Sequence, residues 1–298
     1  MAEFKSGFVT LIGRTNVGKS SIINKLVGEK VSAVTNKTQT TRKNIKAILN
    51  TKNSQIIFTD TPGIHKPKSK LSDVMVESAI SSIPDVDVVV YVVDATSKRI
   101  DEPTLNKIIE ARKKTILLIN KIDLVDAKRV GDIINEYKDL YDFASILPVS
   151  VKLNKNVDEI IKEIERNLDV GPAYYDIEEY TDQTLREMVE EIIREKILKL
   201  LNDEVPHGIY VEVNSLKTKK DRNDKKYFDI NATIFCLKDS HKGIIIGKKG
   251  AMLKRIGTYS REDLEKMLET KVNLKLWVKT NKDWINNANI VNKYKNKT

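Results

Sequence analysis

The chain has 298 residues, of which 40% are hydrophobic, and this length predicts about two globular domains. Its single cysteine, Cys236, excludes a disulfide framework and a cysteine-rich zinc site, and it favours a reducing compartment such as the cytoplasm. The longest apolar run, residues 88–93, is too short to span a bilayer, and residues 1–5 hold no apolar stretch of the signal-peptide type. We therefore expect neither an integral membrane protein nor a secreted one.

The net charge of +10 is concentrated in the last third of the chain. Residues 1–200 contain 31 basic and 30 acidic side chains, whereas residues 201–298 contain 21 and 12, a net charge of +9. Such an asymmetry predicts a module that contacts a polyanion, with nucleic acid as the first candidate. The alternative is a lysine-rich composition whose charges lie on solvated faces.

Strand-like and helix-like segments alternate over the first ~170 residues, which predicts an α/β domain with a mostly parallel sheet covered on both faces. Apolar runs of strand length fall at residues 8–12, 45–49, 55–58, 86–93, 116–119 and 145–149. Helices are expected at residues 20–27, 104–113, 130–140 and 158–168. We place the end of this domain at residue 171.

A Gly-Pro pair at 171–172 opens an acidic, tyrosine-bearing linker, residues 172–183, and a second domain follows over residues 184–298. A helix is expected at 187–201, with Thr184 and Glu187 at capping-box spacing. Strands at 209–213, 228–236 and 272–278, a charged hairpin loop at 217–226, and a helix at 251–268 complete this domain. Residues 286–298 are polar and are expected to fray.

A glycine-bearing loop between the first strand and the first helix matches the pattern G-x-x-x-x-G-K-[ST]. Its residues are Gly13, Arg14, Thr15, Asn16, Val17, Gly18, Lys19 and Ser20, and Ser21 follows them. Backbone amides freed by the glycines and the helix N-terminus would bind phosphates. We expect Lys19 to neutralise the β- and γ-phosphates of a nucleotide and Ser20 to ligate Mg²⁺.

The segment Asp60, Thr61, Pro62 and Gly63 follows a strand and would face the same crevice. Asp60 is expected to hold Mg²⁺, and the Gly63 amide to sense a γ-phosphate. A D-x-x-G turn also occurs as an ordinary turn, so its meaning depends on the phosphate loop.

The sequence Asn120-Lys121-Ile122-Asp123 ends another buried strand. The Asp123 carboxylate can accept two hydrogen bonds from a guanine edge, which adenine lacks, and the Lys121 stem can pack along the ring. Asn120 can bond the base edge, and an amide within Ser150, Val151 and Lys152 could reach guanine O6.

A polar, threonine-rich segment at residues 31–42 has no apolar stripe and predicts a mobile loop. A threonine there could complete the Mg²⁺ shell only when a γ-phosphate is present. Thr41 is our choice, with Thr40 as its rival, and residues 65–70 form a second candidate switch. A plain surface loop is the alternative.

These segments, in this order, resemble the guanine-nucleotide-binding domain of translation-factor-type GTPases, and in detail the Era family. Ile64 stands where Ras-like relatives have a water-orienting glutamine. Either hydrolysis is therefore slow or another group positions the water, and the resemblance suggests a partner or a monovalent cation such as K⁺ near Asn16.

The basic third contains a G-x-x-G loop, Gly247-Lys248-Lys249-Gly250, after the apolar turn that ends at Ile246. A bare G-x-x-G is a weak signal, but the order of elements around it is that of a KH domain, which binds about four nucleotides of RNA. We expect Lys248 and Lys249 to contact phosphates, supported by Lys254 and Arg255.

Residues 180–182, 191–198 and 204–207 also resemble Era, so the likeness covers essentially the whole chain. It implies a P-loop GTPase domain followed by an α+β bacterial-type (type II) KH domain, with GTP or GDP and Mg²⁺ as ligands. It implies hydrolysis of GTP to GDP and phosphate, and binding of the 3′ end of 16S ribosomal RNA during assembly of the 30S subunit. A monomer and peripheral attachment to the inner face of the cell membrane are further expectations.

Two other functions remain open from the residues. One is a nucleotide-dependent RNA-binding protein with little hydrolysis, which Ile64 favours and the Lys19, Ser20 and Asp60 set disfavours. The other is an ATP-using RNA remodelling enzyme, which Asp123 disfavours.

Overall fold

The computed structural model describes residues 3–35, 37, 40–64, 69–201 and 205–294. These residues form two compact units, one of residues 1–182 with the residues from 293, and one of residues 183–292. The division between the units falls after residue 182, so residues 172–182 of the expected linker belong to the first compact unit.

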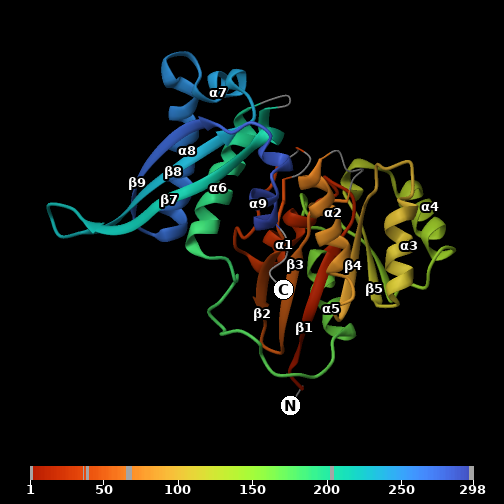
Figure 1. The fold of residues 1–298 in the computed structure, drawn as a ribbon. Helices are drawn as coiled ribbons and strands as arrows, with labels where there is room; N and C mark the ends of the chain where they lie inside the picture. Colours follow the sequence, from red (N-terminus) through yellow and green to blue (C-terminus); the bar gives the residue numbers. More distant parts are fainter. Residues whose placement is uncertain (1–2, 36, 38–39, 65–68, 202–204, 295–298) are drawn as a thin grey trace. The chain divides into compact units, whose positions relative to one another are not determined.

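A six-stranded sheet forms the centre of the first unit, in the order β2-β3-β1-β4-β5-β6 (Figure 1). Its strands are β1 (Lys5–Ile12), β2 (Ile45–Asn50), β3 (Ser54–Asp60), β4 (Val88–Asp94), β5 (Lys114–Asn120) and β6 (Ser145–Pro148). Strand β2 runs antiparallel to β3, and the other pairs are parallel. The mostly parallel sheet predicted from the alternation of elements is therefore confirmed.

Helices cover both faces of this sheet, because the apolar side chains of its strands point to both sides. Helices α1 (Lys19–Val27) and α5 (Val157–Asn167) pack on one face, where Ile22 and Ile160 join the core. Helices α3 (Glu102–Ala111) and α4 (Ala127–Lys138) pack on the other through residues such as Ile108 and Ile133. A short 3₁₀ turn, Ile122–Leu124, follows β5.

One helix of this unit, α2 (Lys70–Ser81), was not predicted from the sequence. It begins at a capping box in which Ser69 and Ser72 bond each other's backbone, and it buries Leu71, Met75 and Ala79 at a spacing of four residues. The serines of this stretch favour loops as well as caps, so the apolar stripe of three residues was too narrow to reveal the helix.

The second unit packs helices against one face of a three-stranded sheet in the order β7-β8-β9. Its main elements are α6 (Leu185–Leu200), β7 (Ile209–Lys220), β8 (Lys226–Cys236), α7 (Asp239–Ile246), α8 (Ala251–Leu268) and β9 (Lys271–Thr280). Strand β8 pairs antiparallel with β7 and parallel with β9. Alternate strand residues such as Val211, Ile230 and Ile234 form the core together with α6 and α8. The hairpin is longer than expected, because β7 and β8 extend to residues 220 and 226.

The C-terminal segment is ordered further than its polar composition predicted. It contains 3₁₀ turns at Trp284–Asn286 and Asn292–Tyr294 and a short helix, α9 (Ala288–Val291), and a further 3₁₀ turn, Val205–Gly208, precedes β7. Trp284 is fully buried, and its Nε1 donates to the Gly208 carbonyl oxygen at 3.0 Å. Within residues 286–294, for which fraying was expected, the structure instead has α9 and a 3₁₀ turn, and Val291 is buried. Residues 295–298 lie outside the described residues. Among the described helices, none has the length and apolar composition needed to cross a bilayer.

The linker lies along the first unit rather than extending freely. The Ile48 amide donates to the Tyr180 carbonyl oxygen at 2.9 Å, and Thr181 Oγ1 donates to the Lys46 carbonyl oxygen at 2.8 Å. The side chain of Gln55 accepts from the amides of both Tyr174 and Tyr175. The outer edge of β2 is therefore occupied by the segment that leads into α6.

Candidate functional site

The phosphate loop, residues 13–20, bends tightly over the carboxyl ends of β1 and β4. Gly13 and Gly18 have φ angles of 155° and 105°. A Cβ atom at Gly13 would lie 2.2 Å from the Val92 carbonyl oxygen, and one at Gly18 would lie 2.3 Å from Nδ2 of Asn120. Glycine is therefore required at both positions by conformation and by space.

Lys19 is the first residue of α1 and is almost fully buried. Its Nζ donates to the carbonyl oxygens of Gly13 at 3.0 Å and Arg14 at 2.9 Å, so the ammonium group lies under the loop. Burial lowers the pKa of Lys19 to about 8, against the opposing effect of the Asp60 carboxylate. An anion bound in the loop would restore the charged form of this side chain.

Three oxygen-bearing side chains meet beside Lys19. Ser20 Oγ donates to Asp60 Oδ2 at 2.7 Å, and Thr41 Oγ1 lies 3.0 Å from Ser20 Oγ and 3.3 Å from Asp60 Oδ2. Thr40 instead donates to the Lys37 carbonyl oxygen at 2.7 Å, so the structure brings Thr41, and not Thr40, to this cluster.

The cluster fits a magnesium ion. Asp60 is fully buried, its Oδ1 has no hydrogen-bond partner among the described residues, and burial raises the pKa of its carboxyl group. Within the described part of the chain, no group of three His, Cys, Asp or Glu side chains is placed to hold a metal. One carboxylate and two hydroxyls suit Mg²⁺, which uses few protein ligands together with water and phosphate oxygens.

The residues after β5 are tied to the phosphate loop. Asn120 Nδ2 donates to the Val17 carbonyl oxygen at 2.8 Å, and Lys121 Nζ donates to the Asn16 carbonyl oxygen at 2.7 Å. Asp123 Oδ1 accepts from Ser150 Oγ at 2.6 Å. The segment Asn120–Asp123 is therefore hydrogen-bonded to the phosphate loop, and the Asp123 carboxylate is hydrogen-bonded to the loop after β6.

The remaining candidates near this end differ in their positions. The Val151 amide donates to Oδ1 of Asn120 at 3.5 Å, whereas Lys152 is exposed.

Asp94, at the end of β4, was not singled out from the sequence, yet it pairs with Lys121 Nζ at 2.6 Å. Burial would raise the pKa of Asp94, but hydrogen bonds from Lys121 and Thr96 outweigh it and hold that pKa below its usual value. Its position at the carboxyl end of a parallel strand was the signal that could have found it.

The turn after β3 packs directly on the phosphate loop. Thr61 Oγ1 donates to the Leu11 carbonyl oxygen at 2.6 Å, and the Ile64 amide donates to the Gly13 carbonyl oxygen at 3.1 Å. A Cβ at Gly63 would lie 2.7 Å from the Thr15 Cα, and Pro62 is buried beside it. Residues 36, 38–39 and 65–68 of the two candidate switches lie outside the described residues.

A groove of about 60 Å³ opens between the phosphate loop and the threonine-rich segment. It is lined by Thr15, Asn16, Gly18, Lys19, Ser20, Ser21, Ala33, Val34, Thr35, Lys37, Thr40, Thr41, Thr61 and Gly63. Most of the sequence-predicted phosphate and metal residues therefore share one cavity.

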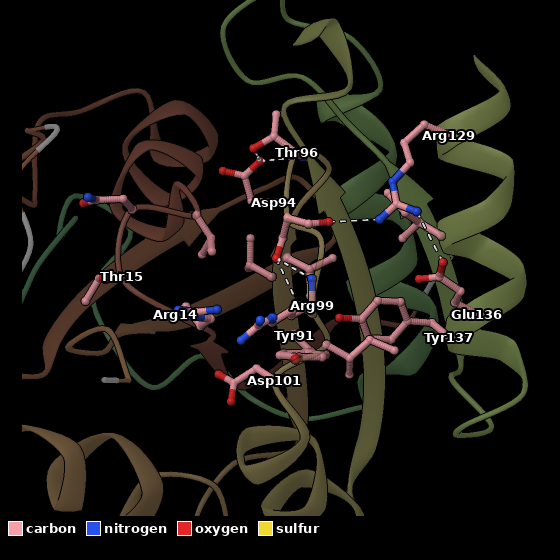
Figure 2. Close-up of a pocket in the computed structure, with 17 residues that line it drawn as sticks. Arg14, Thr15, Tyr91, Asp94, Thr96, Arg99, Asp101, Arg129, Glu136 and Tyr137 are labelled. Atoms are coloured by element: carbon pink, nitrogen blue, oxygen red, sulfur yellow. Dashed lines mark hydrogen bonds and ion pairs between the residues drawn. The ribbon is translucent and has the colours of Figure 1, made fainter. Parts of the chain in front are cut away.

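Gly13, Arg14, Val17, Asp60 and Pro62 do not line this groove, and Arg14 instead lines a different cavity of about 210 Å³. Figure 2 shows it beside Tyr91, Arg99 and Asp101, with Arg129 held by Glu136 on the far wall. The part of Arg14 that borders Lys19 is its carbonyl oxygen.

The G-x-x-G loop joins α7 to α8 in the second unit. Gly247 and Gly250 have φ angles of 72° and 79°, and the Gly250 amide donates to the Gly247 carbonyl oxygen at 3.1 Å. Ile245 is buried in the core, whereas Ile246 is half-buried. Within the described structure no carboxylate pairs with the exposed cations of this region, which are Lys248, Lys249, Lys254 and Arg255.

Two family models match the chain. Residues 8–121 match the model described as 50S ribosome-binding GTPase, and residues 204–285 match the model described as KH domain. The first covers the phosphate loop, the Asp60 turn and the start of the Asn120 motif, and the second covers the G-x-x-G loop.

Curated relatives match over nearly the whole chain. GTPase Era of Clostridium kluyveri is 48% identical over 94% of this chain and 95% of its own length. GTPase Era of Caldanaerobacter subterraneus subsp. tengcongensis is 48% identical over 97% of both chains.

Two solved structures of relatives superpose with a TM-score of 0.92. One is a single-substitution variant of Aquifex aeolicus Era bound to GDP·AlF₄⁻, which is 37% identical and covers 98% of this chain and 99% of its own. The other is Era in complex with MgGDPNP and nucleotides 1506–1542 of 16S ribosomal RNA, which is 38% identical over 98% of both chains.

Proposed function

This chain belongs to the Era family of GTPases, and we propose that it couples GTP hydrolysis to binding of the 3′ region of 16S ribosomal RNA during assembly of the 30S subunit. The observation that carries the proposal is the coexistence of two anion sites. One is the buried Lys19, Ser20, Thr41 and Asp60 cluster of the first unit, and the other is the exposed basic loop at Gly247–Gly250 of the second.

The nucleotide half of the proposal follows from the geometry around Lys19. The amides of the phosphate loop and the Lys19 ammonium would hold the β- and γ-phosphates and stabilise the charge of the transition state. Ser20, Thr41 and Asp60 would hold a Mg²⁺ ion, whose positive charge would neutralise the bound phosphates. The Asp123 carboxylate would accept hydrogen bonds from the guanine edge. The hydrogen bond from Ser150 to one of its oxygens would hold this carboxylate in position.

No side chain beside this cluster is placed as an evident general base among the described residues. Ile64, whose amide bonds Gly13, carries no group that can orient a water. We therefore propose that hydrolysis by the free protein is slow and that bound RNA, the ribosomal particle or a cation near Asn16 accelerates it.

The linker offers a route from the nucleotide to the RNA unit. Thr41 lies four residues before β2, and the outer edge of β2 bonds to Tyr180 and Thr181, a few residues before α6 begins. A γ-phosphate that orders Thr41 would therefore fix the strand to which the linker is attached. This contact supports gating of RNA or particle binding by GTP.

Phosphate release from GTP and binding of fluorescent RNA test the proposal in one preparation. Lys19→Ala is expected to lower phosphate release by about 100-fold or more while RNA still binds. The double variant Lys248→Ala, Lys249→Ala is expected to weaken RNA binding at unchanged GTP affinity, and it avoids Gly247, where a Cβ would lie 2.8 Å from that of Met252. Equal RNA affinity in the double variant would reject the G-x-x-G assignment.

The choice of ribosomal particle needs its own experiment, because one matching family model is named for the 50S subunit. We expect the protein loaded with a non-hydrolysable GTP analogue to co-sediment with 30S and not with 50S subunits. Preferential binding to 50S subunits would overturn this part.

Attachment to the inner face of the membrane and a monomeric state are separate proposals, tested by vesicle flotation and by light scattering.

A further inference from the structure

The sheet of the second unit has two unlike faces. Helices α6 and α8 cover one face, and the strand residues that point toward them are apolar, as Val272 and Leu276 of β9 are. The remaining residues of β9, at positions 271, 273, 275, 277 and 279, are all exposed. We call the face that carries them the outer face.

Trp277 is the main anomaly of the outer face, because the residue is 60% exposed. Its neighbour on β8 is the small residue Thr233, and among the described residues no aromatic ring stacks on the indole. A large flat ring left in water on an open sheet is an unused stacking surface.

Cations surround this ring. Lys275 and Lys279 lie two residues to either side of Trp277 on the same face, about 7 Å along the strand in each direction. The register also places Lys217 on this face, opposite Asp229. Lys217, Lys275 and Lys279 pair with no carboxylate within the described structure, whereas Asp229 is already engaged by Lys219 and Asn273.

Between these groups the outer face carries polar side chains. The strand register also places Glu212 and the half-buried rings of Tyr227 and Phe235 on it, with Phe235 stacked on the buried Tyr210. Asn231 Nδ2 donates to Ser215 Oγ at 2.9 Å, and Thr233 Oγ1 donates to Asn214 Oδ1 at 2.7 Å. A protein partner would require a larger exposed apolar centre than one indole. A polar surface with one exposed aromatic ring, and with lysines that pair with no carboxylate in the described structure, instead matches the stacking and phosphate contacts of single-stranded nucleic acid.

The outer face is separate from the G-x-x-G loop. That loop leads into the N-terminus of α8, and α8 packs through Ile256 and Leu264 on the covered face of the sheet. Strand β9, which carries Trp277, is an edge strand of the sheet. An RNA held at Gly247–Gly250 would therefore reach Trp277 by passing around the β9 edge.

We propose that the outer face is a second RNA-binding surface, on which Trp277 stacks a nucleobase and Lys275 and Lys279 contact the flanking phosphates. This inference rests on the proposed RNA-binding function and extends it to a longer RNA than a KH groove of about four nucleotides accommodates. The surface contributes to affinity for long RNAs and not for short ones.

Fluorescence anisotropy with nested fragments of 16S nucleotides 1506–1542 tests this length dependence on the full chain. We expect Trp277→Ala to weaken the longest fragment about tenfold and to leave the shortest bound fragment unchanged. The charge variant Lys275→Glu, Lys279→Glu is expected to act in the same way. Tyr259→Ala, an aromatic residue of α8 that is 42% exposed, and Lys266→Glu are the matched controls.

A second measurement follows the indole itself. Trp284 is fully buried, so added acrylamide quenches the exposed Trp277 preferentially, and the long fragment is expected to protect it. Three outcomes would overturn the inference without touching the RNA-binding function: Trp277→Ala weakens all fragment lengths equally, it weakens none of them, or the long fragment leaves Trp277 open to acrylamide. If the variant binds all RNAs normally but loses 30S subunits, the face binds a protein instead. Failure of the wild-type chain to bind any fragment rejects the proposed function itself.

Discussion

The two proposed anion sites use positive charge in opposite ways. In the first unit the cation is Lys19, buried under its own loop, with glycines that leave no room for a Cβ. In the second unit the cations are exposed lysines, and a Cβ at Gly250 would meet open space. Burial makes the first site costly to build but selective, because the desolvated ammonium has its charge restored by a well-seated phosphate. The exposed site has a small desolvation cost, and its lysines attract a long polyanion through charges that salt screens.

The largest effect is expected at the buried cation. Lys19→Ala should lower GTP hydrolysis by about 100-fold or more, because one preorganised donor to transition-state charge is lost. Single-turnover phosphate release measures this. Lys25→Ala, on the exposed side of the same helix, is the control and should be near wild type. Comparable losses in both variants would break the distinction between buried and exposed lysines.

Salt should separate the two sites next. If four phosphates of a single strand are contacted, RNA affinity should fall about 50-fold when salt rises fourfold. GTP affinity should change far less, because Lys19 is buried and its contacts are short-ranged. Equilibrium titrations of both ligands at several salt concentrations give the two slopes, and equal slopes would contradict the contrast.

Two neighbouring threonines give a matched pair within the first site. Thr41→Val should slow Mg²⁺-dependent hydrolysis about tenfold, because its hydroxyl lies beside Ser20 and Asp60. Thr40→Val should have little effect on hydrolysis, since its hydroxyl bonds to the Lys37 carbonyl oxygen. Hydrolysis measured over a Mg²⁺ titration distinguishes them, and a larger effect at Thr40 would reassign the ligand.

The smallest effects are expected at two glycines of the second unit with open space around them. Gly250→Ala should lower the free energy of unfolding by about 1 kcal/mol, because its φ of 79° is unfavourable for alanine. Gly243→Ala lies inside α7 and should raise it by up to about 1 kcal/mol. Both tryptophans lie in this unit, so urea unfolding followed by tryptophan fluorescence reports on it directly. Shifts of the same sign would show that φ does not decide the outcome.

Local sequence patterns determined much of this protein. Continuous apolar runs such as that of β4 predicted buried parallel strands, and the spacing of glycines around Lys19 predicted a phosphate loop between a strand and a helix. Alternation along β8 predicted the face that meets the core of the second unit. These features repeat over a few residues, so neighbours in the chain carry the whole signal.

Tertiary structure decided what local patterns leave open. The sequence left Thr40 as a rival to Thr41, and the chain path around Asp60 selected Thr41 as the neighbour of Ser20. Folding also placed Asp94 beside Lys121, and it placed Arg14 in the lining of a cavity other than the groove. These outcomes depend on residues far apart in the chain that come together only on folding. Sequence therefore identified the chemical groups and the fold, whereas long-range packing fixed which groups face each other.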